Sequence, residues 1–494
     1  MASDCVSPAE SARPDAAAER APLFRRPRSV AAVPMVFLGL GLYRAWIEIV
    51  FVGTFVAFPA ATVSARDLFD WTMVATALGC TLLARRIGPF FDKRWPFVLG
   101  SAMLVASTTL MFASCWVASL AAWAGYAAAV AGGFGIALVI LTWSELYGCL
   151  NPLRVALYYS ASIVAGAVVL YAYRGFMLPW LFVMTALLPP LSFWAASRGF
   201  AHLPPQERPA TAWTRFSVPW KAVLSMAAYA FGYGLMENGM YGGVFGPHSA
   251  PGAVLVAVLV FVGISFQGGR FDFSLIYRFA LPLIVAALFL VPVFGGTQNY
   301  AAGFCMAAAY TAQSILIMLI CANICYRYGV SAIWLFGIER GVRQIFMWLG
   351  RVTAAGVGAL ESFGIGGEVA VSALAVVAVA LATAVLLSER DLSSRWGANF
   401  LSGGTDSAAM IRKQELVDRC DEIARTYKLS AREEEVLLLL AQRKTVGIIE
   451  RELLIANGTA KAHVRHIYQK LDIHTRQELF DLLGLDGRET GPQD

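Results

Sequence analysis

About twelve apolar segments, each near 20 residues long, follow one another between residues 33 and 388 and limit the possible folds more than any other feature. A helix of that length crosses the roughly 30 Å hydrocarbon core of a bilayer. The composition agrees, because 58% of the 494 residues are hydrophobic, only 15% are charged and the mean hydropathy is +0.61. A soluble domain has about 25% charged residues. We therefore predict an all-α protein that is mostly embedded in a lipid bilayer.

The apolar segments predict a transmembrane domain over residues 33–388, in two groups of six helices. The predicted spans are 33–56, 68–84, 96–114, 120–143, 153–173, 177–197, 220–237, 252–267, 277–295, 300–324, 331–356 and 367–388. The longest inner connection, about 198–219, contains Pro204, Pro205 and Pro209 and separates the sixth span from the seventh. Residues 1–32 are polar without an apolar core, so we predict a disordered cytoplasmic tail rather than a secretory signal peptide.

Positive charge is distributed unequally between the connections on the two sides of the predicted bundle. Lys and Arg accumulate in connections that face the cytoplasm. Connections after odd-numbered spans hold only Arg66 and Arg174, whereas those after even-numbered spans hold twelve such residues: Arg85, Arg86, Lys93, Arg94, Arg154, Arg198, Arg208, Arg215, Lys221, Arg270, Arg278 and Arg327. This asymmetry predicts a multi-pass protein of the bacterial inner (plasma) membrane with both termini in the cytoplasm.

A short motif repeats weakly in the two halves of the predicted bundle. Connection 2–3 contains a GxxxD match at 88–92, followed by Lys93, and the equivalent connection 8–9 contains a second match at 268–272. With the six-plus-six arrangement, this pattern resembles the major facilitator superfamily, in which connection 2–3 carries G-x-x-x-D-[RK]-x-G-[RK]-[RK]. Trp95 stands where the motif has its second glycine, and the final basic pair is missing. The resemblance implies a similar fold, while the incomplete motif argues mildly against transport.

The composition changes sharply after residue 388. Residues 389–428 begin polar and Gly/Ser-rich, which is typical of a linker. Within them a helix is predicted over 411–427, because apolar residues recur at helical spacing at Leu416, Cys420, Ile423 and Tyr427. Residues 429–484 show a pattern of four short helices and are predicted to form a separate small domain, with residues 485–494 as a tail.

The first and third of these short helices carry the clearest signals. Ser430 and Glu433 have the spacing of a capping box at the start of the first helix. The third helix, capped by Asn457 or Thr459, is expected to turn Ala460, Val464, Ile467 and Leu471 toward the core. No acidic residue occurs between 457 and 470, so the basic residues there give one side of the helix a positive charge. Such a helix is typical of a major-groove reader, although charge alone fits a solvated surface equally well.

The stretch L-S-A-R-E-E-E-V-L-L-L-L-A … I-A-N-G-T-A-K-A-H-V-R-H-I-Y-Q-K-L is similar to the LuxR-type helix-turn-helix over about 55 residues. Core and DNA-facing positions both match, at Leu429, Arg432, Glu433, Val436, Leu437, Leu440, Leu453, Ile455, Gly458, Thr459, Lys461, His463, Val464, Ile467, Lys470 and Leu471. The sequence departs from the family at Arg443, where a glycine is usual, and at Ile448 and Glu450, where Glu and Ala are usual.

This resemblance implies that the chain binds double-stranded DNA, most directly through its third short helix. The DNA-binding residues it implies are Thr459, Lys461, Ala462, Arg465, Gln469 and Lys470. Among them, Lys461, Ala462 and Arg465 are implied to face base edges or nearby phosphates, while Thr459 and Lys470 are implied to contact phosphates. The fourth helix is implied to form a homodimer interface, and we expect Leu479, Leu482 and Leu483 on one of its faces.

Ionisable residues inside the predicted spans are unusual, because each charge costs about 2.5–3.5 kcal/mol at the centre of a bilayer. The candidates for a ligand site are Arg44, Glu48, Gln313, Glu339 and Arg343, with Tyr43, Trp46, Tyr310 and Trp348 as possible walls. Two pairs of these charged residues are four positions apart, which allows intrahelical ion pairs. The pairs either lock helices together or line a polar cavity between the two halves.

The sequence shows no receiver domain, P-loop, catalytic triad or metal-ligand spacing, so we predict no enzyme activity, no cofactor and no metal. The preferred interpretation is a one-component sensor in which an unknown small-molecule signal acts on the membrane domain and changes DNA binding. The alternative is a major-facilitator-like transporter with a regulatory DNA-binding tail. A third possibility is that the bundle only anchors a constitutive DNA-binding domain.

Overall fold

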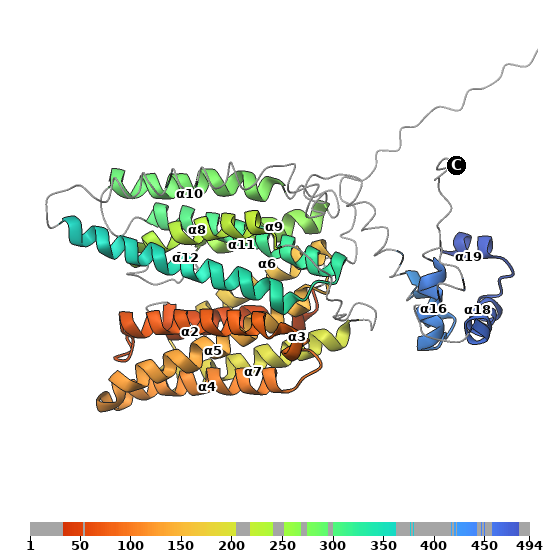
Figure 1. The fold of residues 1–494 in the computed structure, drawn as a ribbon, viewed down its shortest axis with the longest axis horizontal. Coiled ribbons are helices and arrows are strands. Elements are labelled where there is room, and N and C mark those ends of the chain that lie inside the picture. Colours follow the sequence, from red (N-terminus) through yellow and green to blue (C-terminus); the bar gives the residue numbers. More distant parts are fainter. Residues whose placement is uncertain are drawn as a thin grey trace, which may run out of the picture.

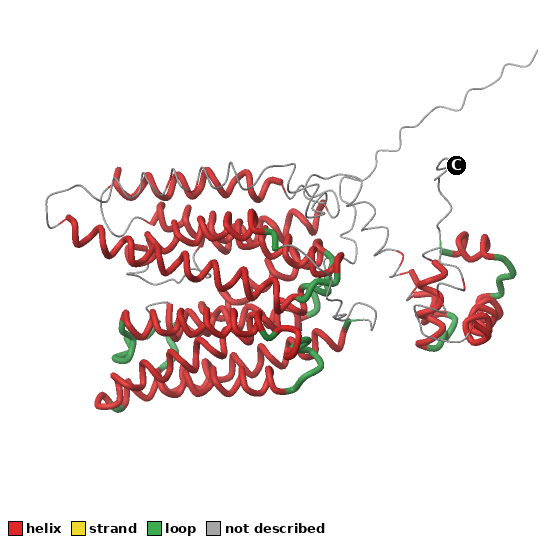
Figure 2. The backbone as a smooth tube through the Cα atoms, in the orientation of Figure 1, coloured by secondary structure: helices red, strands yellow, loops and turns green. Residues whose placement is uncertain are grey.

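The computed structural model describes residues 33–52, 55–203, 218–240, 251–267, 274–294, 300–361, 422–441 and 457–483, together with residues 376, 379, 416, 419, 420, 446 and 449. Within these residues the regular elements are all helices, and no strand occurs among them (Figure 2). The long helices lie roughly side by side in a bundle (Figure 1). The prediction of an all-α chain is therefore confirmed for the residues that are described.

The bundle follows the predicted order of spans. Its helices are η2 (Met35–Leu38), α1 (Gly39–Ile47), a π-helical turn (Glu48–Val52), α2 (Val63–Leu82), α3 (Ala84–Ile87), α4 (Trp95–Trp116), η4 (Ala118–Leu120), α5 (Ala121–Tyr147), α6 (Pro152–Tyr173), α7 (Leu178–His202), α8 (Trp220–Met240), α9 (Pro251–Gln267), α10 (Ser274–Phe294), α11 (Tyr300–Tyr328) and α12 (Ala332–Glu361). They correspond to the first eleven predicted spans. The twelfth, 367–388, lies outside the described residues except for Val376 and Val379, which are helical.

Several described helices have the length and hydropathy of membrane spans. Six of them are long enough and apolar enough to cross a bilayer: Met35–Val52, Trp95–Trp116, Ala121–Tyr147, Pro152–Tyr173, Leu178–His202 and Tyr300–Tyr326. Large apolar side chains such as Trp180 and Phe266 are exposed on the outside of the bundle, at 63% and 78%. An exposed apolar surface is expected where lipid rather than water is the solvent.

The two halves of the bundle meet through related pairs of helices. In the first half α2 packs against α12 of the second half, and α6 packs against α9. In the order of spans, the second helix of each half thus contacts the fifth helix of the other. Reciprocal contacts of this kind are expected when two similar six-helix units are related by an approximate two-fold axis.

The connection between α3 and α4 is held by a buried acid at the end of α5. The Glu145 carboxylate accepts hydrogen bonds from the backbone N–H of Phe90 at 2.9 Å and of Phe91 at 3.0 Å. Lys93 Nζ donates to the carbonyl of Gly88 at 3.0 Å, which closes the turn. The first GxxxD match therefore lies in an ordered turn, while the second, 268–272, falls outside the described residues.

Several basic residues that were assigned to connections lie inside the ends of helices instead: Arg154 in α6, Arg198 in α7, Lys221 in α8, Arg278 in α10 and Arg327 in α11. Arg66 was also placed in an outer connection, but it lies inside α2, which begins at Val63. The helix starts there because Thr62 is its N-cap and its Oγ1 accepts a hydrogen bond from the N–H of Ala65 at 3.1 Å. Arg66 is therefore positioned by a helix that packs against the other half of the bundle.

The C-terminal domain contains α16 (Ala431–Ala441), α18 (Asn457–Leu471) and α19 (Arg476–Leu482). Their apolar faces form one core with the described residues of the linker helix, and its fully or partly buried members include Leu416, Cys420, Ile423, Val436, Leu437, Leu440, Ala460, Val464, Ile467, Leu471, Leu479 and Leu483. Of the second predicted helix only Val446 and Ile449 are described, and both are helical. Of the three leucines expected on one face of the fourth helix, Leu479 and Leu483 are buried, whereas Leu482 is 40% exposed; Phe480 is also buried.

Helices α8 and α12 approach each other at two glycines. A Cβ added to Gly350 would overlap the backbone carbonyl of Phe231, and one added to Gly234 would overlap that of Met347. Helix backbones come this close only where neither helix carries a side chain at the crossing. The contact places the C-terminal part of α12 directly against α8.

We predict that Gly350→Ala lowers the midpoint of thermal unfolding of the detergent-solubilised protein. The methyl group has no space between the two backbones, and such overpacking costs about 1–3 kcal/mol. Gly356→Ala is the matched control, because a Cβ at Gly356 of the same helix has no atom within 4 Å. Equal midpoints for the two variants would contradict the close packing of α8 and α12.

Candidate nucleic-acid interface and buried polar sites

Helix α18 has one buried face and one exposed face. Ala460 and Ile467 are fully buried, Leu471 is 4% exposed and Val464 packs against the same core, as predicted. The first turn begins at Asn457, so Thr459 lies within the helix rather than before it.

The predicted DNA-binding residues are distributed over the opposite side of α18. Lys461, Arg465 and Gln469 are exposed and Ala462 is half-buried. Because these four residues are separated by one, three and four positions, they form one stripe along the helix. Thr459 is exposed in the first turn, where a phosphate group is favoured by the free backbone N–H groups of a helix N-terminus.

Lys470 has a structural contact that the sequence did not indicate. Its Nζ donates to Glu433 Oε2 at 2.7 Å and to the carbonyl of Lys428 at 3.3 Å, which joins the end of α18 to the start of α16. Its side chain keeps 39% of its surface exposed, so the implied phosphate contact remains a prediction.

The predicted capping box at Ser430 and Glu433 is present. Glu433 Oε2 accepts from the N–H of Ser430 at 2.7 Å, and Ser430 Oγ accepts from the N–H of Glu433 at 3.3 Å. Burial raises the pKa of Glu433, but the hydrogen bonds from Lys470 and Ser430 outweigh burial and lower the pKa to about 2. The carboxylate is therefore ionised near neutral pH and holds two helices together.

A second capping box opens α19. Thr475 is the N-cap and its Oγ1 accepts from the N–H of Glu478 at 3.2 Å, while Glu478 Oε2 accepts from the N–H of His474 at 2.9 Å. At the other end of α19, Arg419 of the linker helix donates to the carbonyl of Leu483. The linker helix is thus attached to the last helix of the domain.

A chain of polar contacts crosses the middle of the bundle from α1 to α12. The Arg44 guanidinium donates to the hydroxyl of Tyr159, and that hydroxyl lies 3.1 Å from Ser314 Oγ. Arg343 donates to Ser314 Oγ at 3.0 Å and to Glu339 Oε1 at 2.6 Å. Arg44, Glu339 and Arg343, three of the five predicted ligand-site residues, therefore belong to one buried network that joins the two halves. The predicted Glu339–Arg343 pair is confirmed.

The other two predicted ligand-site residues are also buried. Gln313 donates to Ser225 Oγ of α8 at 2.9 Å. Glu48, which is 1% exposed, begins the π-helical turn that ends the first span. π-helical turns inside helices are frequent at functional sites. The ion pair predicted between Arg44 and Glu48 remains a prediction.

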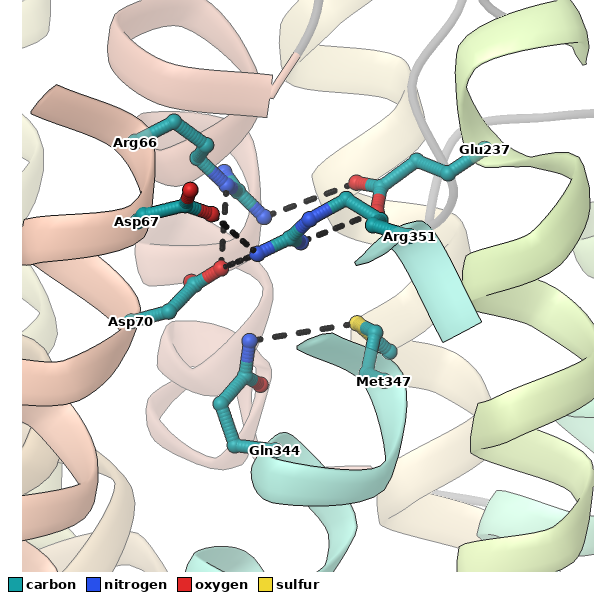
Figure 3. A network of polar contacts seen from close by, with 7 residues as sticks. All are labelled: Arg66, Asp67, Asp70, Glu237, Gln344, Met347 and Arg351. Carbon is teal, nitrogen blue, oxygen red and sulfur yellow. Dashed lines mark hydrogen bonds and ion pairs between the residues drawn. The ribbon is translucent and has the colours of Figure 1, made fainter. Parts of the chain in front are cut away.

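A separate cluster of charges, Arg66, Asp67, Asp70, Glu237 and Arg351, joins α2 to α8 and α12 (Figure 3). Arg351 contacts Asp70, lies 3.0 Å from Glu237 Oε2 and lies 3.3 Å from Asp67 Oδ1. Arg66 lies 3.5 Å from both Asp70 Oδ2 and Glu237 Oε1. We call these five residues the interhalf ion cluster. Asp70 is fully buried, so the cluster holds charge away from solvent.

The sequence reasoning missed most of the residues that complete these networks. Asp70 and Arg351 are charged residues inside the predicted spans 68–84 and 331–356, and this position alone marks them as candidates. Tyr159 and Ser314 look like ordinary residues of apolar helices. Their roles became visible only when α6 and α11 were placed between the arginines of α1 and α12.

Comparison with known families identifies the C-terminal domain. Residues 427–483 match the family model described as bacterial regulatory proteins, luxR family. This segment is therefore a LuxR-family helix-turn-helix domain, as its sequence predicted. A search of curated protein sequences found no match to the chain.

The membrane helices resemble those of solved transporters. A bacterial homologue of the iron transporter ferroportin in an outward-facing state aligns with 74% of this chain and 97% of its own, with 12% identity and a TM-score of 0.50. A major facilitator superfamily transporter, FucP, in an outward conformation aligns with 73% of this chain and 100% of its own, with 12% identity and a TM-score of 0.43. The membrane part therefore shares its fold with this ferroportin homologue, and similarity at this identity shows the fold alone.

We predict that Glu433→Gln lowers the free energy of unfolding of the C-terminal domain by about 1 kcal/mol near pH 7, as loss of a helix cap does. Because the pKa of Glu433 lies below its ordinary value of 4.5, the ionised group stabilises the fold above pH 4.5 and loses that effect as the pH falls toward 2. Hydrogen exchange of the α16 amides in the full-length protein measures the difference. The control is Glu422→Gln, at an exposed site of the linker helix. A difference that stays constant down to pH 2 would contradict this assignment.

Proposed function

We propose that this chain is a membrane-bound bacterial transcription regulator that binds double-stranded DNA and is controlled by a signal sensed by its membrane domain. The main support for the proposal is that a LuxR-family DNA-binding domain and a major-facilitator-like bundle occur in one polypeptide chain. The proposal places the protein in the inner membrane with both termini in the cytoplasm, where the DNA is. The inward bias of Lys and Arg in the connections supports that orientation.

DNA binding is assigned to the exposed stripe of α18. Lys461 and Arg465 supply charge-assisted donors for phosphates and base edges, and Gln469 supplies an amide suited to adenine. The ion pair of Lys470 with Glu433 keeps α18 fixed against α16, so these donors are presented on a rigid helix. Preorganised donors lose less entropy when they bind.

A homodimer through α19 is part of the proposal. Leu482 is exposed on α19 although leucine is usually buried, and an exposed leucine next to a helix-turn-helix is suited to contact with a second copy. Two domains related by two-fold symmetry would read two half-sites one helical turn apart. The contact of Arg419 with Leu483 connects this surface to the linker helix and thereby to the membrane domain.

Control by the membrane domain is assigned to a shift between two arrangements of its halves. The interhalf ion cluster joins the halves in the present arrangement, and its charges are costly to leave unpaired in a buried site. A signal changes the population of the two arrangements only if it binds one of them more tightly. A transporter with a regulatory tail would also use such a cluster, but it would move solute across vesicles.

Lys461→Ala and Arg465→Ala are each expected to weaken DNA binding by about 1–3 kcal/mol, or roughly 5- to 150-fold. Binding is measured with the purified full-length protein on fragments recovered by genome-wide mapping of its bound sites. Arg425→Ala removes the same charge from the exposed surface of the linker helix and should change affinity by no more than about twofold. Unchanged affinity in both α18 variants would refute the assignment of this helix.

Arg351→Gln is expected to change the output of a promoter reporter relative to wild type when no signal is present. The substitution leaves Asp70 and Glu237 with only the longer 3.5 Å contacts of Arg66 and favours the arrangement in which the halves separate at this end. The double variant Asp70→Arg, Arg351→Asp restores an ion pair and should return the reporter toward wild type. Reporter output is compared at equal protein abundance. If Arg351→Gln and the milder Glu237→Gln both leave the output unchanged, the bundle is an anchor rather than a sensor.

A further inference from the structure

Three guanidinium groups converge on the polar chain in the middle of the bundle. Arg44 reaches it from α1, and Arg340 and Arg343 reach it from α12. All three act electrostatically on the Tyr159 hydroxyl, so they lie near the same point. Arg44 and Arg343 are each 4% exposed, and the side chain of Arg340 is 13% exposed.

Among the described residues, the carboxylates near this point carry less charge than the three arginines. One carboxylate serves both Arg340 and Arg343, because Glu339 Oε1 binds Arg343 while Glu339 Oε2 lies 3.3 Å from Arg340 Nε. When Glu48 is counted as a second carboxylate, three guanidiniums still leave one positive charge in excess. An uncompensated charge inside a membrane domain is costly and marks a functional site.

Arg340 also has donors to offer. Its buried Nε lies beside Glu339 but makes no hydrogen bond, and a guanidinium carries five N–H donors in a planar fork. Tyr43 and Tyr310 lie within electrostatic range of Arg340, so aromatic side chains border the same place. Arg340 was absent from the ligand-site residues that the sequence suggested, because Glu339 and Arg343 already formed a complete i, i+4 pair.

We propose that this site, formed by Arg44, Arg340, Arg343 and Tyr159, binds a small organic acid through a single carboxylate. The proposal deepens the proposed function and rests on it, since the acid would be the signal that the membrane domain senses. A carboxylate supplies one negative charge, which matches the excess, and it fits the fork of a guanidinium with two parallel hydrogen bonds. A phosphate group would bring more charge than the site lacks.

Binding at this place would act on the arrangement of the halves. Arg44 belongs to the first half and Arg340 to the second, so an anion held by both attracts α1 and α12 toward one point. An arrangement that separates the two arginines loses one of the contacts to the anion. The acid would therefore prefer the arrangement in which both arginines reach it, which is the condition for a ligand to shift the population.

The test is thermal unfolding of the full-length protein in detergent with acetate, propionate or benzoate, each compared with its uncharged amide, and with inorganic phosphate. At least one acid is expected to raise the wild-type midpoint by several degrees more than its amide. Arg340→Gln should abolish that difference without lowering the midpoint of the unliganded protein, because it removes the excess charge. Arg340→Lys should keep part of the difference. Arg86→Gln, at an exposed site after α2, is the control that should keep all of it.

Three results would overturn the proposal. In the first, no acid of the panel raises the wild-type unfolding midpoint more than its amide does. In the second, an acid still raises the midpoint of Arg340→Gln more than its amide. In the third, the midpoint of Arg340→Gln without acid lies well below that of wild type. Stabilisation by phosphate alone would overturn the carboxylate assignment. A reporter measurement separates this proposal from the sensor proposal. If an acid binds but the reporter does not respond, the anion site is supported and the sensor function is contradicted. If the reporter responds only to uncharged compounds, the sensor function is supported and the anion site is contradicted.

Discussion

The pairing of buried charge between the two halves of the bundle is the interaction on which the membrane domain depends. Arg351 brings its guanidinium to a fully buried Asp70 and to Glu237, so helices that are far apart in sequence are joined by groups that cannot be left unpaired without a large free-energy cost. The glycine crossing of α8 with α12 lies one residue from Arg351, so the backbone at Arg351 comes close to α8. Packing against lipid discriminates weakly between arrangements of apolar helices, whereas an ion pair requires its partner at a defined position. The register of the two halves is therefore set by their polar contacts.

The central polar chain and the C-terminal domain use the same chemistry for different purposes. In the C-terminal domain Glu433 is both the capping acid of α16 and the counter-ion of Lys470, so one carboxylate completes a local structure and fixes the position of α18. In the bundle Glu339 has two arginines and satisfies neither completely. The first arrangement is closed and its charges balance. In the bundle, Glu339 with Arg340 and Arg343 has a net positive charge. This difference distinguishes a structural ion pair from a candidate ligand site.

Much of the architecture was predictable, because each level of it leaves a periodic or compositional signal. Apolar segments of membrane length predicted eleven described helices, and the capping spacing of Ser430 and Glu433 predicted the start of α16. The pair Glu339–Arg343 was predictable because it lies within one helix. Contacts between helices were not, since no local pattern relates Arg44 to Tyr159 or Arg351 to Asp70, which are separated by 115 and 281 positions. The exposed Leu482 and the buried Phe480 show the same limit, because helical spacing alone does not decide which of two neighbouring apolar residues meets the core.

The packing of the linker helix onto the C-terminal core has a geometric consequence for how the domain finds DNA. Leu416 already belongs to that core, and Val379 still belongs to the core of the bundle. The 37 residue steps from Val379 to Leu416 can span at most about 130 Å, even if every residue were fully extended. Under the proposed function, the DNA-binding domain would therefore reach DNA only within a shell of about that depth beneath the bilayer. A target sequence would have to enter that shell to be bound, so the position of a gene relative to the membrane would become part of its regulation.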